Sequence, residues 1–204
     1  MRIFRTLKRI VRILIVPHRE WVSIADESES IVLIIKYYAW PFIVVGALIK
    51  TVSVFLKFTD EANLIQFKIP FLLTVLLFNM VVPLFVIFVG GSLISSLSRS
   101  MGASGQKKSA LRLLIYSLTP VFMATILANS EIHFQYLQSI GLIGIYSGVL
   151  FWMGMKPLLE IPPERKLGLL IFSMMILSFL FFIMMFVTRI SINLLYPEGV
   201  ILFL

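Results

Sequence analysis

The stretch LGLLIFSMMILSFLFFIMMFVT (Leu167–Thr188) contains no charged residue and is long enough to cross a lipid bilayer as a helix. A hydrocarbon core of about 30 Å requires about 20 apolar residues, and no water is present there to satisfy an open backbone. Four further segments of similar character precede it. The predicted transmembrane helices are Ile31–Leu56, Pro70–Leu97, Leu111–Ala128, Leu137–Leu159 and Leu167–Thr188. The sequence therefore predicts an all-α integral membrane protein with a bundle of five transmembrane helices.

The composition supports this class. Of the 204 residues, 59% are hydrophobic, and the mean hydropathy is +1.00. A soluble domain of this length needs much more polar surface, so part of the apolar excess has to face lipid. The connecting loops are too short to fold alone. We therefore predict a cytoplasmic N-terminal segment (residues 1–30), one membrane domain (31–188) and a short extracytoplasmic tail (189–204).

The placement of positive charge predicts the topology. The net charge is +8, and basic residues gather before the first span, around the second loop and around the fourth loop. These residues are Arg2, Arg5, Lys8, Arg9, Arg12 and Arg19, then Arg99, Lys107, Lys108 and Arg112, then Lys156, Arg165 and Lys166. The opposite side carries only Lys50, Lys57, Lys68 and Arg189. By the positive-inside rule, the N-terminus and these two loops are cytoplasmic, and five spans leave the C-terminus outside.

The first 16 residues, MRIFRTLKRIVRILIV, alternate basic and apolar residues at helical spacing. One predicted face carries Ile3, Leu7, Ile10, Ile13 and Leu14, and the other carries Arg2, Arg5, Lys8, Arg9 and Arg12. Such a helix suits the cytoplasmic interface, with its apolar face in the acyl boundary and its cations on lipid phosphates. Pro17 is predicted to end it, and a polar approach then leads to Ser30, the expected N-cap of the first span.

Several spans contain residues that interrupt a plain apolar helix. Pro83 should kink the second span, and the pair Gly144 and Gly148 in the fourth allows another helix backbone to approach closely. Polar or helix-breaking residues also recur at similar depth in three spans. They are Asn79, Pro83, Thr119, Pro120, Tyr146 and Ser147. Two interpretations stay open for this intramembrane polar cluster, the lining of a hydrated pathway and hydrogen bonding between helices.

The sequence offers little support for catalysis. None of the ten acidic residues lies in the middle of a span, which argues against proton-coupled transport. The two histidines, His18 and His133, fall on opposite sides of the membrane, and cysteine is absent. No phosphate-binding loop and no nucleophile beside a base is visible. We therefore predict a protein that is not an enzyme and has no cofactor or metal site. Its basic residues flank membrane helices, so nucleic-acid binding is not expected.

Three stretches together resemble the Yip1 domain family. The first is Pro17-His-Arg-Glu20-Trp21 with Ile24 and Glu27, before the first span. The second is Tyr116-Ser-Leu-Thr-Pro120 with Val121, Phe122 and Met123, inside the third span. The third runs from Ile145-Tyr146-Ser147-Gly148 through Gly154 and Pro157 to Ile161-Pro162-Pro163-Glu164-Arg165-Lys166. The resemblance covers about Pro17 to Phe186 and points to the small inner-membrane proteins of the bacterial branch.

The resemblance implies a five-helix bundle with a cytoplasmic N-terminus, in agreement with the charge distribution. Eukaryotic relatives are associated with vesicle trafficking and Rab-type GTPases, through a long N-terminal region that does not precede the first span here. We therefore carry over no expectation of GTPase binding. The expected location is a bacterial inner membrane.

The leading functional hypothesis is a non-enzymatic adaptor or membrane-organising protein. It would contact partners or lipid head groups through Arg9, Arg12, Lys107, Lys108, Arg165 and Lys166. The expected partners are anionic lipids of the cytoplasmic leaflet and other membrane proteins, and homo-oligomerisation stays open. The alternative is a small transporter or channel for a neutral or lipidic solute. A third interpretation, a lipid-handling protein, needs a lateral opening between helices.

Overall fold

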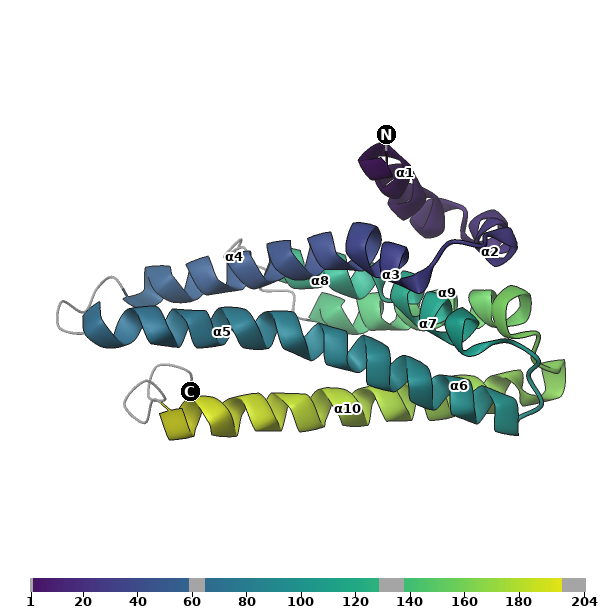
Figure 1. Cartoon of the computed structure of the whole chain (residues 1–204). Helices are drawn as coiled ribbons and strands as arrows, with labels where there is room; N and C mark the ends of the chain where they lie inside the picture. Colours follow the sequence, from purple (N-terminus) through teal and green to yellow (C-terminus); the bar gives the residue numbers. More distant parts are fainter. Residues whose placement is uncertain (1, 59–64, 129–137, 196–204) are drawn as a thin grey trace.

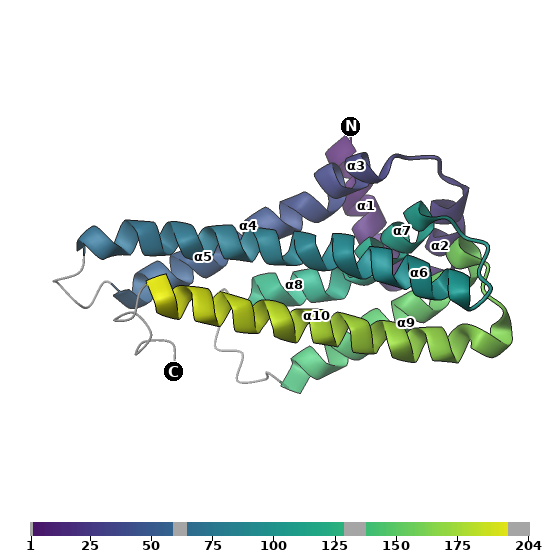
Figure 2. The same ribbon diagram turned by 60° about the horizontal axis from the view of Figure 1, so that its bottom comes forward.

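The structure, a computed structural model, describes residues 2–58, 65–128 and 138–195, and all regular secondary structure in these ranges is helical. The helices form an elongated bundle in which α5 and α10 run along its length (Figures 1 and 2). In chain order the elements are α1 (Arg2–Ile15), α2 (Pro17–Asp26), α3 (Ile31–Ile34), η1 (Ile35–Ala39), α4 (Trp40–Phe58), α5 (Ile65–Phe85), η2 (Val86–Gly90), α6 (Gly91–Ser100), α7 (Lys107–Ser117), α8 (Thr119–Ala128), α9 (Gln138–Leu159), η3 (Pro163–Arg165) and α10 (Lys166–Leu195).

Several of these elements join end to end into longer rods. Four rods are long and apolar enough to cross a membrane, namely Ile31–Leu56, Ile69–Ser100, Lys107–Leu127 and Pro163–Leu195. They correspond to the first, second, third and fifth predicted spans, which are confirmed as helices of spanning length. The fourth predicted span coincides with α9, whose described apolar part is the shorter segment Ile143–Leu159. Its predicted first residue, Leu137, lies outside the described residues, so a fifth crossing stays a prediction.

The third span is the central helix of the bundle. In its most apolar 18-residue window, 67% of the residues are buried inside the protein, against 11% in the second and fifth spans. Its mean hydropathy is also lower, 1.7 against 2.7. A helix surrounded by protein does not need an apolar surface toward lipid. The central position of the third span therefore explains both its high buried fraction and its low mean hydropathy. The largest buried cluster is built around this helix and includes Leu113, Leu114 and Tyr116.

Prolines and wide helical turns shape three of the rods. In the second span, Pro83 precedes the π-helical turn η2, and the rod bends in its second half (Figure 1). The predicted kink therefore has two contributors, a proline without an N–H and a π-bulge. The first span has a similar turn, η1, just before Pro41. In the third span, α7 ends at Ser117 and α8 begins at Thr119, beside Pro120.

The N-terminal segment differs from the prediction. The amphipathic helix α1 is present and ends before Pro17, but a second helix, α2, follows it directly, with Pro17 in its first turn. Only residues 27–30 of the expected polar approach are non-helical. Proline fits a first helical turn because its missing N–H would have no partner there. Trp21 and Ile24 of α2 are 1% exposed and belong to the main core. A helix places Trp21 and Ile24, three residues apart, on the same face, so both side chains can pack against the core at once.

The glycines that allow close packing are not the predicted pair. A Cβ added to Gly144 would meet nothing within 4 Å, and one on Gly148 would meet only the Met174 side chain at 3.8 Å. Six residues after Gly148 on α9, a Cβ on Gly154 would lie 2.5 Å from Leu113 Cδ1 and 2.8 Å from Trp21 Cε2. Within this chain, the close approach of α9 to its neighbours therefore occurs at Gly154.

Gly154→Ala should destabilise the protein by about 1–3 kcal/mol, because the added methyl has no room between Leu113 and the indole of Trp21. Gly144→Ala is the matched control on the same helix and should leave stability unchanged or slightly raised, since alanine is the better helix former. Thermal denaturation of the two purified variants in the same detergent measures the difference. Equal loss in both variants would contradict the packing described around Gly154.

Candidate functional site

A buried arginine joins the N-terminal helices to the bundle. Arg9 of α1 is 8% exposed, and its Nε donates a hydrogen bond to Glu20 Oε1 of α2 at 3.2 Å. Its Nη1 donates to Glu27 Oε2 at 2.7 Å, and Nη2 bonds the other oxygen of the same carboxylate. Nη1 also donates to the hydroxyl of Tyr116 in α7 at 3.1 Å. One guanidinium therefore contacts three separate parts of the chain.

The electrostatic environment of Arg9 keeps its charge in place. Burial by itself lowers the pKa of this guanidinium, but the hydrogen bond with Glu27 and the contacts with Tyr116 outweigh it and raise the pKa above its ordinary value. A buried charge is tolerated only when it is paired and hydrogen-bonded. The bidentate contact with Glu27 and the single contact with Glu20 meet this condition.

Aromatic side chains continue the cluster into the bundle. The Tyr116 ring lies 5.6 Å from the Arg9 guanidinium carbon, as in a cation–π contact. Its edge-to-face neighbours are Trp21, with centroids 6.3 Å apart, and Tyr38 of η1, at 4.6 Å. All three rings are at most 3% exposed. We call Arg9, Glu20, Trp21, Glu27, Tyr38 and Tyr116 the Arg9 cluster.

Thr119 connects this cluster to the break in the third span. Pro120 has no N–H to donate to the carbonyl of Tyr116, four residues earlier, and Thr119 Oγ1 donates to that oxygen instead at 2.6 Å. Since the threonine proton is used there, the 2.6 Å contact between Tyr38 and Thr119 has the tyrosine hydroxyl as its donor. Thr119 is fully buried. Its hydroxyl donates to the carbonyl that Pro120 cannot reach and accepts from Tyr38 of the first span, so it joins the two spans at the proline break.

Arg112 fixes the segment that leads into the first span. Its Nη1 donates to the carbonyl of Glu27 at 2.6 Å, and Nη2 donates to the carbonyl of Glu29. These residues lie between the end of α2 and the start of α3, where no helix satisfies the backbone acceptors. The Arg9 cluster and Arg112 together hold both ends of this short connection against α7.

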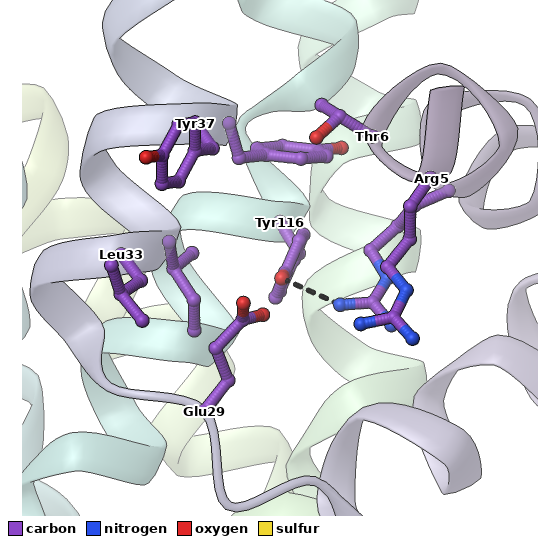
Figure 3. A pocket seen from close by; sticks show the side chains of 9 residues that line it. Arg5, Thr6, Glu29, Leu33, Tyr37 and Tyr116 are labelled. Atoms are coloured by element: carbon purple, nitrogen blue, oxygen red, sulfur yellow. Dashed lines mark hydrogen bonds between the residues drawn. The ribbon is translucent and has the colours of Figure 1, made fainter. Parts of the chain in front are cut away.

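A small pocket opens beside the cluster (Figure 3). Arg5 and Thr6 of α1 line one side, and Leu33 and Tyr37 of the first span line the other; the remaining lining residues are Arg9, Glu29, Ile34, Tyr38 and Tyr116. It encloses about 40 Å³, room for about three water molecules. Pockets for small organic ligands enclose about 300–1,000 Å³, so this one is too small to hold such a solute.

The loops at this end of the bundle are also joined to each other. The N–H of Gly105, before α7, donates to the carbonyl of Leu159 at 3.1 Å, and Ser104 bonds the Glu160 carboxylate. A Cβ on Gly105 would lie 2.8 Å from the carbonyl oxygen of Leu158, so only glycine allows this contact. The second and fourth loops therefore lie together at one end of the bundle, and the N-terminal helices, also predicted to be cytoplasmic, pack at the side of the bundle toward that end (Figure 1).

The structure separates Arg9 from the other predicted partner contacts. Arg12, Lys107, Lys108 and Arg165 are exposed at this end, and Lys166 is half-buried with its Nζ 4.2 Å from the centroid of Trp152. Arg9 instead has its charge neutralised within the protein. The sequence pattern grouped Arg9 with the other cations on the basic face of α1. A helical periodicity shows which residues share a face, but not which face the bundle covers.

The predicted intramembrane polar cluster is divided among different contacts. Asn79 donates to the carbonyl of Val75 in its own helix, and Thr119 bonds Tyr38 and the Tyr116 carbonyl. Tyr146 donates to the carbonyl of Leu14, at the end of α1. Ser147 is buried, Pro120 is buried beside Thr119, and Pro83 is half-buried. None of the six lines the pocket beside the Arg9 cluster.

Comparison with protein families finds a match over most of the chain. The model of the Yip1 domain matches residues 11–185, most of the chain. The chain belongs to the Yip1 domain family. Yip1 proteins are non-enzymatic, polytopic membrane proteins of trafficking and membrane organisation, so this chain is an integral membrane protein and not an enzyme. No curated protein and no solved structure matches it.

Residues from all three stretches that carry the Yip1 resemblance meet in or beside the Arg9 cluster. Glu20, Trp21 and Glu27 come from the first motif, Tyr116 and Thr119 from the second, and Gly154, against Trp21, from the third. Sequence reasoning missed two of their partners, Tyr38 and Arg112. Tyr38 was not singled out as a site residue in the sequence, and Arg112 was counted only among the basic residues that predict the topology. A polar aromatic and a cation directed into a bundle carry the same sequence pattern as those at its surface.

Arg9→Gln should release α1 and α2 from the bundle, because Glu20 would be left buried without its cation, at a cost on the order of 3 kcal/mol. Hydrogen exchange in detergent micelles should show faster exchange in residues 2–26, while α9 and α10 remain protected. Arg12→Gln is the control. The Arg12 side chain is 55% exposed and lies 4.0 Å from Glu20, at the limit of an ion pair, so this variant should behave like the unaltered protein. Unchanged protection in Arg9→Gln would contradict this role.

Thr119→Val should destabilise the third span by about 1 kcal/mol, because it removes the side-chain hydrogen bond to the Tyr116 carbonyl and leaves the Tyr38 hydroxyl without its acceptor. Thr119→Ser keeps the hydroxyl and should lose much less. Thermal unfolding of both variants tests this, and a serine variant as unstable as the valine variant would show that the methyl group, not the hydroxyl, matters at this position.

Proposed function

We propose that this Yip1 protein is an adaptor that organises other components at the membrane, and that it binds acidic partners through a basic cytoplasmic face. The basic face consists of Arg12, Lys107, Lys108, Arg165 and Lys166. One observation carries the proposal: exposed cations gather at one end of the bundle. They are Arg5, Lys8, Arg12, Arg19, Arg99, Lys107, Lys108, Lys156 and Arg165, against the exposed acids Asp26, Glu160 and Glu164.

The geometry of this face favours binding over a purely topological role. Positive-inside retention needs cations near the helix ends but no fixed arrangement among them. Here the hydrogen bond from Gly105 to Leu159 holds the second and fourth loops together, so Lys107, Lys108 and Arg165 belong to one surface. Such a surface can complement an acidic partner and steer its approach.

The proposal includes a topology. The charge asymmetry supports five crossings, with the N-terminus, the second loop and the fourth loop in the cytoplasm and the C-terminus outside. The tail after Leu195 lies outside the described residues. We further propose a bacterial inner membrane as the location, on the strength of the motif resemblance to that branch of the family.

A small transporter is the less well supported alternative. Its predicted pathway residues include Thr119, Asn79 and Tyr146, and each of these has a hydrogen-bond partner within the protein. A lipid-handling role would need a lateral opening between helices, and no feature of the described residues argues for one.

The test is photo-crosslinking in native membranes from positions 107 and 165, followed by mass spectrometry of the adducts. We expect a reproducible protein adduct that disappears when Lys107, Lys108 and Arg165 are all changed to Glu, while the amount of membrane-inserted protein is unchanged. The matched control exchanges the cations, with Lys107→Arg, Lys108→Arg and Arg165→Lys, and should keep the adduct.

Two outcomes would overturn the proposal. An adduct that survives charge reversal would mean that these cations do not select the partner. Adducts with lipid alone would favour transport or lipid handling, which a solute-flux assay in liposomes would then separate.

A further inference from the structure

The helix α1 has three distinct faces rather than the two predicted from its sequence. The first face packs on the protein: Ile13 is fully buried, Arg9 is 8% exposed, and Ile10 and Leu14 are half-buried against the main core. The hydrogen bond from Tyr146 to the Leu14 carbonyl holds the C-terminal end of the helix. The predicted apolar face is therefore divided, because Ile10, Ile13 and Leu14 are turned toward the bundle.

The second face is apolar and exposed. Leu7, Val11 and Ile15 are 56%, 54% and 72% exposed, and they lie four residues apart. At 100° per residue, this spacing forms one continuous stripe along the helix. No described residue covers the stripe, although burying each of these side chains would be favourable.

The third face is basic and adjoins the stripe. Arg5, Lys8 and Arg12 are all exposed, and each follows the apolar stripe by about a quarter-turn around the helix. In contrast to Arg9, none of them has a close carboxylate partner among the described residues; Arg12 lies 4.0 Å from Glu20, at the limit of an ion pair. An apolar stripe edged by a row of cations matches the boundary between acyl chains and anionic head groups.

The position of α1 agrees with this chemistry. It packs against η1 near the beginning of the first span, the level at which that span passes from apolar residues to the polar connection after α2. In Figures 1 and 2, α1 lies beside α3, at the side of the bundle rather than beyond its end. A bilayer around the first span would, at this level, place acyl chains and head groups beside the outward-facing stripe.

We propose that α1 is a lipid-docking helix, in which Leu7, Val11 and Ile15 insert into the acyl boundary while Arg5, Lys8 and Arg12 bind anionic head groups. The ion pairs of Arg9 set the rotation of the helix, so that the stripe points into the bilayer. The lipid-docking face shares only Arg12 with the basic face, and this proposal does not depend on a protein partner for Lys107, Lys108 or Arg165.

The chain has no cysteine, so single cysteines can carry nitroxide labels in the full-length protein reconstituted into bilayers of zwitterionic and anionic lipid. Labels at positions 7, 11 and 15 should collide with oxygen, which concentrates in the acyl region, and be protected from a water-soluble nickel chelate. Labels at positions 8 and 12, on the same helix, should show the opposite preference. They serve as internal controls for folding.

Two results would overturn the lipid assignment. Equal access of the nickel chelate to all five labels would place α1 in water. Protection of positions 7, 11 and 15 from both reagents would mean that protein, such as a second copy of the chain, covers the stripe.

The basic row is tested separately with the triple variant Arg5→Gln, Lys8→Gln and Arg12→Gln. The enrichment of brominated anionic lipid around the protein, measured by quenching of tryptophan fluorescence, should fall about fivefold or more. Neutralising Lys107, Lys108 and Arg165 should change it far less. If both triple variants lose the same enrichment, the row on α1 has no special affinity for lipid. Failure of the adaptor proposal would leave this result unaffected.

Discussion

The charge of Arg9 has to be neutralised inside the protein, and the N-terminal part of the fold is arranged around that requirement. Removing a guanidinium from water costs several kcal/mol unless good geometry and hydrogen bonds compensate for it. The carboxylates of Glu20 and Glu27 provide the charge, and the Tyr116 hydroxyl provides a third acceptor. These partners come from α2, from the connection after it and from α7, so α1 cannot leave without exposing all of them. A contact of this kind specifies position more than it adds stability.

From Arg9 a continuous set of contacts runs into the bundle. Tyr116 packs on Tyr38, and Tyr38 bonds Thr119 at the proline break of the third span. On the other side, Trp21 packs against Gly154 of α9. The motifs that identify the Yip1 domain therefore meet where helices from both halves of the chain are joined. Their positions serve assembly of the domain, which accords with a family that is non-enzymatic.

The sequence predicted the elements well and their mutual orientation poorly. The length of the apolar segments was sufficient to locate the spans, because a single segment in a bilayer satisfies its backbone hydrogen bonds only as a helix. The rotation of α1 could not be predicted, since Arg9 and Arg12 differ only in which side the bundle covers. The helix α2 was missed because its polar residues hide the short apolar pair Trp21 and Ile24. Likewise, the spacing of Gly144 and Gly148 predicts close helix packing, but the close contacts occur at Gly154, where Leu113 and Trp21 are the neighbours. The sequence does not show which glycine has such neighbours.

The most direct test of this account is a distance measurement by pulsed electron paramagnetic resonance between nitroxides at positions 8 and 156, on α1 and α9. With Arg9 present, we expect one narrow distance distribution, and Arg9→Gln should broaden it. A label pair at positions 149 and 172, on the exposed surfaces of α9 and α10, should stay narrow in both proteins. A broad distribution for the first pair with Arg9 present would contradict the docking of the N-terminal helices, and a narrow one that survives Arg9→Gln would contradict the role of the arginine.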